Sequence, residues 1–430
     1  MDSIQASRGT RDILPEEVLY WQYVEDIARD RLQRAGYHEL RTPVFEQTAL
    51  FERGIGEATD IVGKEMYTFL DRGERSITLR PEGTAGAVRA FIEHKLHAHG
   101  GAQRLWYIGP MFRYERPQAG RQRQFHQIGV EVLGTDAPRA DVEVIAIAAD
   151  LLNSLGVQDW TLDLNSVGTQ SDRQHYREAL VDYFSQHLQD LDADSQDRLQ
   201  RNPMRILDSK DAKTQDLAQS APNILDYLGS ESRQHFDQVQ QLLTQLQIPY
   251  QLNPCLVRGL DYYTHTAFEF KLTDLGAQST VCGGGRYDGL VAELGGPQTP
   301  AVGWAMGLER LILLLHHRNL DLASTVEFYC VARGDAAEAQ ALSLSRDLRQ
   351  LGFSVEMDLS GSAFGKQMKR ADRSGAIACL ILGDAEAQDH TVQLKWLSSG
   401  EQETLAQTEL LTQGDRLRQK IIVGKPAKRV

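Results

Sequence analysis

Apolar residues near the N-terminus recur at intervals of three and four positions, which is the spacing of one face of an α-helix. The positions are Val18, Trp21, Val24, Ala28 and Leu32. We therefore expect an amphipathic helix over residues 16–35. A short strand over residues 40–42 should follow it and end at Pro43, because proline cannot donate a hydrogen bond to a sheet.

Strand patterns dominate the following part of the chain. We expect hairpin-like strands over 66–80 and 105–134, a helix over 138–155, strands over 256–272 and 278–283, and a glycine-bearing helix over 302–317. Consecutive strands of this kind favour an antiparallel sheet. Residues 169–240 differ, because they are rich in Gln, Asp and Arg with Leu and Tyr at helical spacing, and they predict a helical insertion.

The pattern changes again near Asn319. We expect strands over 326–332, 354–357 and 377–382, helices over 336–351 and 363–374, and a hairpin over 392–396 and 403–406. This alternation predicts an α/β domain with a largely parallel sheet. The predicted organisation is therefore α+β. It consists of an antiparallel domain flanked by helices (1–168 and 241–320), a helical insertion (169–240) and a C-terminal α/β domain (325–430).

Length and composition indicate the class of protein. A chain of 430 residues is too long for one ordinary core. Its 41% hydrophobic and 24% charged residues are typical of a soluble globular protein. Met1–Glu17 has no apolar stretch of signal-peptide length, and Leu308–Leu315, the densest apolar run, is too short to span a bilayer. We therefore expect a cytoplasmic protein with no membrane contact.

Cysteine spacing and charge narrow the chemistry further. The four cysteines lie far apart without zinc-binding spacing, so we interpret them as reduced core residues and assign no metal ligand. The net charge of −13 argues against non-specific nucleic-acid coating. Residues 414–430 are nevertheless basic, and an RNA contact and a solubilising tail are equally good interpretations of them. The basic residues are Arg416, Arg418, Lys420, Lys425, Lys428 and Arg429.

The segment Trp106–Gly134 predicts a strand, a loop over 116–122 and a return strand. Alternate residues of a strand share a face. The two faces of the return strand are Ile128, Val130 and Val132 on one side, and Gln127, Gly129 and Glu131 on the other. The first face suits packing on helices. The second is wrong for a core and right for the floor of a pocket, because its glycine leaves room for a ligand.

Arg113 lies on the outgoing strand, and the same alternation places it beside Gln127 and Glu131. A guanidinium is the natural partner of a phosphate, since its fork matches the oxygens and it never deprotonates. The loop and the residue after it add Arg116, Arg121 and Arg123. These residues indicate an anion pocket, and an exposed hairpin with a solvated charge cluster is the alternative.

Three further segments carry candidate chemistry. Leu79–Thr84 holds a carboxylate at a Pro–Gly turn that could bind a primary ammonium, although most such turns are only turns. Leu256–Glu269 combines paired tyrosines with Arg258, and a core strand with a salt bridge is the alternative. Gly283–Leu290 begins with three consecutive glycines that permit unusual backbone angles and close ligand approach, without the pattern of a P-loop or a Rossmann turn.

Gly303, Gly307 and Arg310 have the spacing of one helical face. A glycine face would let a helix lie close to a sheet, and Arg310 would project from that contact. A buried arginine is costly unless it meets an anion. The pattern therefore indicates an anion site, and a tightly packed helix with a paired arginine is the alternative.

Together these segments resemble the histidyl-tRNA synthetase family over nearly the whole chain. Arg8–Glu16 resembles the family's N-terminal stretch, and the segments ending at Pro43, Glu131 and Arg310 resemble class II motifs 1, 2 and 3. Other synthetases share those motifs. Leu256–Glu269 and Gly284–Leu290 resemble the two motifs specific for histidine. The resemblance implies a class II catalytic domain that activates L-histidine with ATP and Mg²⁺ and transfers it to histidine tRNA.

The resemblance also implies roles for individual residues. Arg113 and Arg258 would be catalytic at the α-phosphate of ATP, and Arg310 would bind the γ-phosphate. Further ATP-binding residues would be Glu115, Arg121 and Phe125. The histidine-binding set would be Glu82, Gly83, Thr84 and Gln127 near the α-amino group, Glu131 and Tyr263 at the imidazole, Tyr262 and Tyr287 as pocket walls, and Arg258. Arg116 and Gln118 would touch the acceptor end of tRNA.

The C-terminal domain resembles the anticodon-binding domain of related synthetases in Phe364–Asp372 and Leu380–Gly383. Lys366, Lys369 and Arg370 would place positive charge on one helix there, as RNA contact requires. The family is a homodimer through motif 1, and we expect the same here.

The main alternative is a histidine-sensing regulatory paralogue, which lacks the anticodon domain and has degraded histidine motifs. The chain keeps Arg113, Arg258 and Arg310 as well as residues 325–430, which favours the synthetase. A synthetase for another amino acid would not explain Leu256–Glu269. Two departures from the family, His265 in place of the frequent arginine and the small Ala267, concern pocket packing.

Overall fold

The computed structural model describes residues 3–56, 59–118, 120–257, 260, 262–272, 280–318, 320, 322 and 326–424. The chain divides into two compact units, Met1–Asn319 and Leu320–Val430. The predicted division of the first unit into a catalytic domain and an insertion stays a prediction. None of the helices in the described part of the chain is long and apolar enough to cross a membrane.

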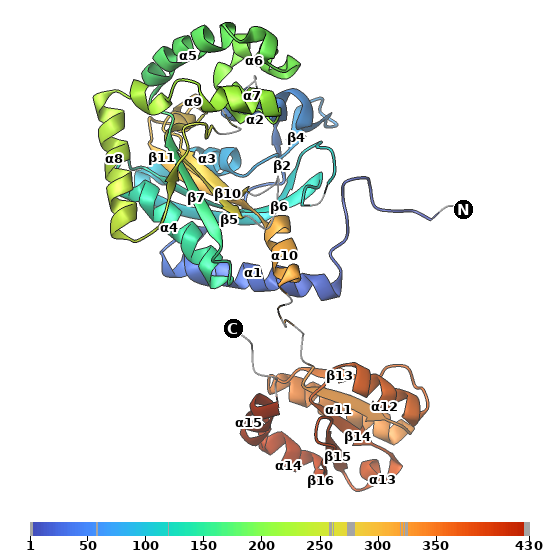
Figure 1. Cartoon of the computed structure of the whole chain (residues 1–430). Coiled ribbons are helices and arrows are strands. Elements are labelled where there is room, and N and C mark those ends of the chain that lie inside the picture. The colour runs from blue at the N-terminus through green and yellow to red at the C-terminus, as the bar shows by residue number, and fades with distance from the viewer. Residues whose placement is uncertain are drawn as a thin grey trace. The chain divides into compact units, whose positions relative to one another are not determined.

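An eight-stranded sheet forms the centre of the first unit (Figure 1). Its strands, in spatial order, are β1 (His38–Glu39), β5 (Gln103–Phe112), β6 (Gln124–Leu133), β11 (Ala301–Gly307), β10 (Thr280–Arg286), β9 (Thr264–Leu272), β7 (Trp160–Ser166) and β8 (Gln251–Leu252). The six central strands pair antiparallel, as predicted, and the two edge strands pair parallel to their neighbours.

Helices cover the apolar face of this sheet, as the pattern of β6 predicts. Val130 on that face is fully buried and pairs with Trp304 of β11, whose indole N–H donates to the Val144 carbonyl at 2.8 Å. Val144 belongs to α4 (Pro138–Ser154), which contacts α1 (Pro15–Arg34) and α8 (Ser230–Gln245), while α1 also contacts α10 (Leu308–His317). The buried face of α1 is Trp21, Val24, Ala28 and Leu32, which confirms the predicted amphipathic helix.

A separate three-stranded antiparallel sheet contains the predicted 66–80 hairpin. Its order is β2 (Phe45–Gln47), β4 (Ser76–Leu79) and β3 (Tyr67–Leu70). The helices α2 (Thr48–Ile55), α3 (Thr84–Glu93) and α9 (Leu290–Glu293) contact one another beside it. The start of α3 lies against strand β5, because a Cβ at Gly83, the residue before α3, would lie 2.1 Å from the ring of Tyr107.

The segment predicted as a helical insertion is helical. It contains α5 (Gln170–Ser185), α6 (Ala193–Arg201), the 3₁₀-helix η4 (Pro203–Asp208), α7 (Ala212–Gln219) and the first part of α8. Its apolar residues Tyr176, Leu180 and Phe184 belong to one continuous core cluster with Tyr263 and Tyr287. The insertion therefore shares its core with the segments that carry the histidine-specific motifs.

The second unit has a five-stranded mixed sheet. Its order is β13 (Val355–Met357), β12 (Phe328–Ala332), β14 (Ala378–Leu382), β15 (Thr391–Trp396) and β16 (Gln402–Ala406), and its helices are α11 (Asp335–Gln350), α12 (Phe364–Arg373), α13 (Asp384–Gln388), α14 (Gln407–Thr412) and α15 (Gly414–Gly424). The first three strands are parallel and the last two form the predicted antiparallel hairpin, so the sheet is less parallel than we predict.

Two sequence interpretations concern side chains elsewhere in the fold. Cys282, Cys330 and Cys379 are buried free thiols, as expected of core residues, whereas Cys255 is half-buried. The described basic residues of α15 contact their own domain, since Arg418 donates to the Leu351 carbonyl and Lys420 lies 3.5 Å from a carboxylate oxygen of Glu403.

Candidate active site

The floor of the candidate site is the polar face of β5 and β6. Their register pairs Tyr107 with Gly129. A Cβ on Gly129 would lie 2.0 Å from Cζ of Tyr107, and a Cβ on Gly83 would lie 2.1 Å from Cε2 of the same ring. The space that we predict at Gly129 for a ligand is therefore filled by Tyr107, and this part of the prediction is wrong. Gly129 leaves the room that the phenol ring of Tyr107 occupies.

Glu131 is the buried carboxyl group of the site. It accepts hydrogen bonds from the hydroxyls of Tyr107, at 3.2 Å, and Tyr287. Burial raises the pKa of Glu131 to about 8, although the hydrogen bond from Tyr287 opposes that rise. The carboxyl group is therefore largely protonated at neutral pH. Gly303 of β11 makes room for it, because a Cβ at Gly303 would lie 2.0 Å from Oε2 of Glu131.

Three tyrosines from the two histidine-specific segments form one buried aromatic wall. The ring of Tyr262 lies 4.8 Å from that of Tyr263 and 5.6 Å from that of Tyr287. All three side chains are at most 8% exposed. The structure therefore brings the two segments together around Glu131, and it places the hydroxyl of Tyr287 directly on the carboxyl group that we expect to bind imidazole.

The Glu82 segment precedes helix α3. The carboxylate of Glu82 accepts backbone hydrogen bonds from Thr84 at 2.6 Å and Ala85 at 2.8 Å. Burial raises the pKa of Glu82, and those two backbone bonds oppose the rise. A carboxylate has about four acceptor positions, so two bonds to the helix leave capacity for an ammonium group.

A cavity of about 160 Å³ collects the predicted ATP-binding residues. Its lining includes Arg113, Glu115, Arg121, Phe125, Gln127, Gly307 and Arg310. The guanidinium of Arg113 lies 5.2 Å from the centre of the Phe125 ring, and its Nε donates to the Pro81 carbonyl at 2.8 Å. That bond fixes the orientation of the guanidinium fork. Cations and an aromatic ring around a small cavity suit a nucleotide phosphate and base.

Arg113 and Gln127 line the same cavity, but Arg113 does not lie beside Glu131 as we predict. Strand β5 ends at Phe112, and the backbone N–H of Arg113 donates to the Arg123 carbonyl. Glu131 pairs with Leu105, near the other end of the hairpin. Residues on the same face of a strand can still lie far apart along it. The two ends of the hairpin therefore differ: Arg113, the candidate phosphate ligand, lies at one end, and Glu131 lies near the other.

The predicted glycine face of a helix over 302–317 is wrong. Residues Ala301–Gly307 form strand β11, and α10 begins only at Leu308. Gly303 and Arg310 are therefore on different elements. Arg310 is nevertheless half-buried beside the cavity, where it donates to the Thr280 carbonyl. Burial and the neighbouring Arg121 lower the pKa of Arg310. A half-buried arginine next to a second cation is the environment expected of an anion-binding site.

Two other predictions about backbone need correction. Strand β9 begins at Thr264 rather than at residue 256. The three consecutive glycines, Gly283, Gly284 and Gly285, lie within strand β10 and have no positive φ angles, so they supply close packing rather than unusual backbone angles. Arg258 lies outside the described residues. Arg116 and Gln118 are exposed on the β5–β6 loop, where Gln118 bridges to Arg121.

Sequence reasoning misses Tyr107 and also the pair His126 and Glu309. The backbone N–H of His126 donates to both carboxylate oxygens of Glu309, at 2.9 and 3.0 Å, and its Nδ1 lies 3.0 Å from Oε1. Glu309 directly precedes Arg310, so this contact ties the start of α10 to β6. The sequence signal would have been the acidic residue adjacent to the candidate arginine.

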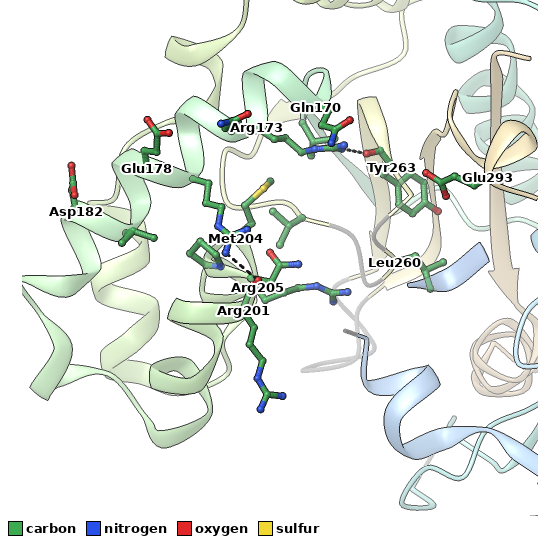
Figure 2. Close-up of a pocket in the computed structure, with 17 residues that line it drawn as sticks. Gln170, Arg173, Glu178, Asp182, Arg201, Met204, Arg205, Leu260, Tyr263 and Glu293 are labelled. Atoms are coloured by element: carbon green, nitrogen blue, oxygen red, sulfur yellow. Dashed lines mark hydrogen bonds between the residues drawn. The ribbon is translucent and has the colours of Figure 1, made fainter. Parts of the chain in front are cut away.

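A larger cavity, of about 880 Å³, lies between the insertion and the histidine-specific segment. Figure 2 shows Arg173, Arg201 and Arg205 from the insertion on one side and Tyr263 and Leu260 on the other. Among the described residues, no group of three His, Cys, Asp or Glu side chains could hold a metal ion.

An antiparallel sheet with an arginine-bearing hairpin, a cationic cavity and a following helix that carries a further arginine defines a class II aminoacyl-tRNA synthetase. Comparison with known proteins identifies the family. The family model for histidyl-tRNA synthetase matches residues 9–311, and a model for an anticodon-binding domain matches residues 327–413. The chain belongs to the histidyl-tRNA synthetase family.

Relatives and solved structures agree with this assignment. The chain is 74% identical to a histidine–tRNA ligase of Acaryochloris marina over 99% of each protein, and 74% identical to one of a Cyanothece species over 98% of each. Its structure is similar to that of apo histidyl-tRNA synthetase of S. aureus, with a TM-score of 0.81 and 40% identity over 95% of this chain and 99% of that one.

Proposed function

We propose that this chain uses ATP to activate L-histidine as histidyl-adenylate and transfers the histidyl group to the 3′ end of histidine tRNA in the cytoplasm. The observation that carries the proposal is the layout of β6. One strand presents Glu131 to a wall of tyrosines and, four residues earlier, Gln127 to the arginine-lined cavity. An amino acid with an imidazole side chain would therefore lie next to the phosphates of ATP.

Histidine recognition would use both kinds of polar group in the pocket. A neutral imidazole has one donor and one acceptor nitrogen. The carboxyl group of Glu131 and a phenol such as Tyr263 can satisfy both. Glu82, beside Gly83 and Thr84, would hold the α-amino group. Because these partners are buried, an analogue that lacks either nitrogen leaves one of them unpaired and is rejected strongly, by on the order of 10⁴-fold.

The activation step would be an in-line displacement at the α-phosphorus by the histidine carboxylate, which releases pyrophosphate. Arg113, oriented by its bond to the Pro81 carbonyl, would bind the α-phosphate, and Arg310 the γ-phosphate. Arg258 would stabilise the developing charge from the opposite side, an assignment that rests on the family resemblance. Positioning and cationic stabilisation do most of the work in such reactions. For the transfer step, we propose that a phosphate oxygen of the adenylate accepts the proton of the tRNA hydroxyl.

Mg²⁺ fits the site as an ion that accompanies the nucleotide. Mg²⁺ typically binds one or two carboxylates together with substrate phosphates and water. Glu115 lines the cavity, but its carboxylate is already 3.1 Å from Arg121. When bound, the ion would neutralise phosphate charge.

The tRNA would be held at both ends. Arg116 and Gln118 are exposed on the β5–β6 loop and available to the acceptor end. In the second unit Lys366 and Lys369 are exposed on α12, whereas Arg370 is tied to Asp358 at 2.7 Å. The two lysines are therefore better candidates for anticodon contact than Arg370.

A homodimer would cover the exposed apolar residues of the small sheet. Phe45 on β2 is 57% exposed and Leu70 on β3 is 68% exposed. These strands follow the motif 1 segment, through which the family dimerises. Large exposed apolar side chains grouped on one sheet are typical of an interface.

The decisive test is ATP–pyrophosphate exchange with each of the twenty amino acids, followed by charging of histidine tRNA, with Arg258→Ala alongside. Exchange with histidine alone, charging of the tRNA and a large loss in the variant are expected. Histidine binding without exchange would indicate the regulatory paralogue, which the match of residues 327–413 to an anticodon-binding domain disfavours. Exchange with another amino acid would overturn the specificity.

A further inference from the structure

The helical insertion is anchored at its root by one carboxylate, that of Asp172 on the first turn of α5. Thr169, on the outgoing chain, donates its backbone N–H to Asp172 at 2.8 Å. On the returning chain Gly229 donates its N–H at 2.9 Å and Ser232 its hydroxyl at 2.6 Å. The first turn of α5 therefore has a fixed position relative to the end of β7.

Arg173 extends from this fixed turn toward the candidate active site. Its Nη1 donates a hydrogen bond to the backbone carbonyl of Tyr263, as Figure 2 shows. Two backbone hydrogen bonds hold His265, close to Tyr263, against the residues that precede the insertion. The N–H of Val167 donates to the His265 carbonyl at 2.7 Å, and the N–H of His265 donates to the Gly168 carbonyl at 2.9 Å. Arg173 of the insertion, together with Val167 and Gly168 directly before it, thus contacts the backbone of the histidine-specific segment at three points.

The side chain of Tyr263 has little freedom to move independently of its backbone. It is 8% exposed, and a Cβ on Gly285 would lie 2.8 Å from its Cδ1. His265, the second residue of β9, has a φ angle of +47°, so the chain bends sharply at the start of that strand. A change at the Tyr263 carbonyl would therefore shift the phenol relative to Glu131 and Tyr287.

We infer that Arg173 is a positioning residue for the histidine pocket, which holds the phenol of Tyr263 in place from the insertion. This inference rests on the proposed role of Tyr263 in histidine binding. Misplacement of a binding group by about 1 Å can cost up to about 10²-fold in activity. Because Arg310 and Phe125 at the ATP cavity belong to other elements, the effect should be confined to histidine.

The chain offers a matched control one turn further along α5. Arg177 lines the same cavity, but its guanidinium donates to the carbonyls of Gln200 at 3.0 Å and Arg201 at 3.4 Å, within the insertion. Loss of Arg177 removes a similar side chain and similar charge without touching the Tyr263 segment.

ATP–pyrophosphate exchange without tRNA tests the inference in Arg173→Ala, Arg173→Lys and Arg177→Ala. We expect Arg173→Ala to raise the KM for histidine about tenfold and to leave the KM for ATP within about twofold of wild type. Lysine should restore part of the loss, since it can still donate one hydrogen bond. Arg177→Ala should behave like wild type. An unchanged histidine KM in Arg173→Ala, or equal changes for both substrates or both arginines, would overturn the inference.

Tyr263→Phe and the double variant with Arg173→Ala separate this inference from the proposed function. If Arg173 acts through the phenol, the double variant should be no worse than the more damaged single variant. Full additivity would refute the positioning role while leaving the histidine site intact. If Tyr263→Phe alone has no effect on the KM for histidine, then the proposed role of Tyr263 is wrong, and the inference fails with it.

Discussion

The phenolic hydroxyl of Tyr287 donates a hydrogen bond to the carboxyl group of Glu131, although the two residues are 156 positions apart in the sequence. The contact exists because β6 and β10 pair with opposite edges of β11. A glycine at position 303 of that intervening strand leaves the space in which they meet. The site is therefore assembled by strand order rather than by any local motif.

Tyr287→Phe removes the donor from Glu131. A hydrogen bond between neutral groups contributes about 0.5–1.5 kcal/mol, so we expect the KM for histidine to rise by up to about tenfold. The KM for ATP should not change, because Tyr287 does not line the ATP cavity. Steady-state exchange kinetics would measure both constants, and a parallel rise in both would contradict the assignment.

Glu131→Gln should stabilise the ligand-free protein increasingly as pH rises. The folded state raises the pKa of Glu131 from 4.5 to about 8. Its proton is therefore retained in the folded but not in the unfolded chain between those values, and the resulting stability is lost as pH rises toward 8. Glutamine does not titrate. The advantage of the variant should grow by up to about 1.4 kcal/mol per pH unit and level off above pH 8. Thermal unfolding at pH 5 to 9 measures it, and a constant difference would refute the buried acid.

Gly303→Ala and Gly307→Ala lie on the same strand and should differ sharply. A Cβ at Gly303 would lie 2.0 Å from Oε2 of Glu131 and 2.3 Å from the Val130 carbonyl oxygen, whereas nothing lies within 4 Å of a Cβ at Gly307. We expect Gly303→Ala to lower the free energy of unfolding by about 1–3 kcal/mol. Urea unfolding of the two variants provides the comparison, and equal losses would show that the strand tolerates both side chains.

Asp141→Asn should be among the most destabilising single substitutions. Asp141 and Arg286 form an ion pair in which both side chains are 0% exposed. Loss of the Asp141 charge leaves the buried Arg286 with Asp288, at 3.1 Å, as its remaining carboxylate partner. We therefore expect a loss that approaches that of a broken buried pair, about 3–5 kcal/mol. Asp30→Asn is the control, since Asp30 pairs with Arg34 on the surface of α1, and loss of such a pair costs at most about 0.5 kcal/mol. Urea unfolding would show whether burial accounts for the difference.

Phe45→Asp should dissociate the proposed homodimer without unfolding the chain. The charge would have to be buried in the interface at a cost of several kcal/mol. Leu342→Asp is a matched control, because Leu342 is 58% exposed on α11 of the second unit. Sedimentation of the wild type and both variants gives the masses. A wild-type monomer, or a Phe45→Asp dimer of full stability, would contradict the proposed interface.

Much of the fold follows from hydrophobic periodicity. Helix α1 and the alternation of strands and helices in the second unit are local patterns that survive in the structure. Strand β11 is missed because the helical spacing of Gly303, Gly307 and Arg310 is given more weight than the alternation of Val302, Trp304 and Met306 with Gly and Ala, which indicates a strand. The sequence pattern fails to predict strand β7 for another reason. Its polar residues Asp163 and Asn165 are buried, where Lys271, Gln251 and Asn253 satisfy Asp163.

The residues of the candidate site likewise fall into those that a local pattern predicts and those that it does not. Residues within a recognisable motif, such as Arg113 and Glu131, can be named from the sequence. Tyr107 cannot, because its place follows from the register that pairs it with Gly129 and from the nearby start of α3. The distance between Arg113 and Glu131 also depends on where the hairpin strands begin and end, which alternation alone does not specify.

The hydrogen bonds that Thr169 and Gly229 donate to the carboxylate of Asp172 make the segment between them an exchangeable module. Both of its ends meet at one carboxylate, so its interior can be lengthened, shortened or replaced while the path of the chain through the sheet stays unchanged. Variation in this module can therefore accumulate without rebuilding the catalytic framework. The exceptions are Arg173 and the buried residues Tyr176, Leu180 and Phe184, which share a core with Tyr263 and Tyr287, so that a change at these positions would affect the substrate pocket.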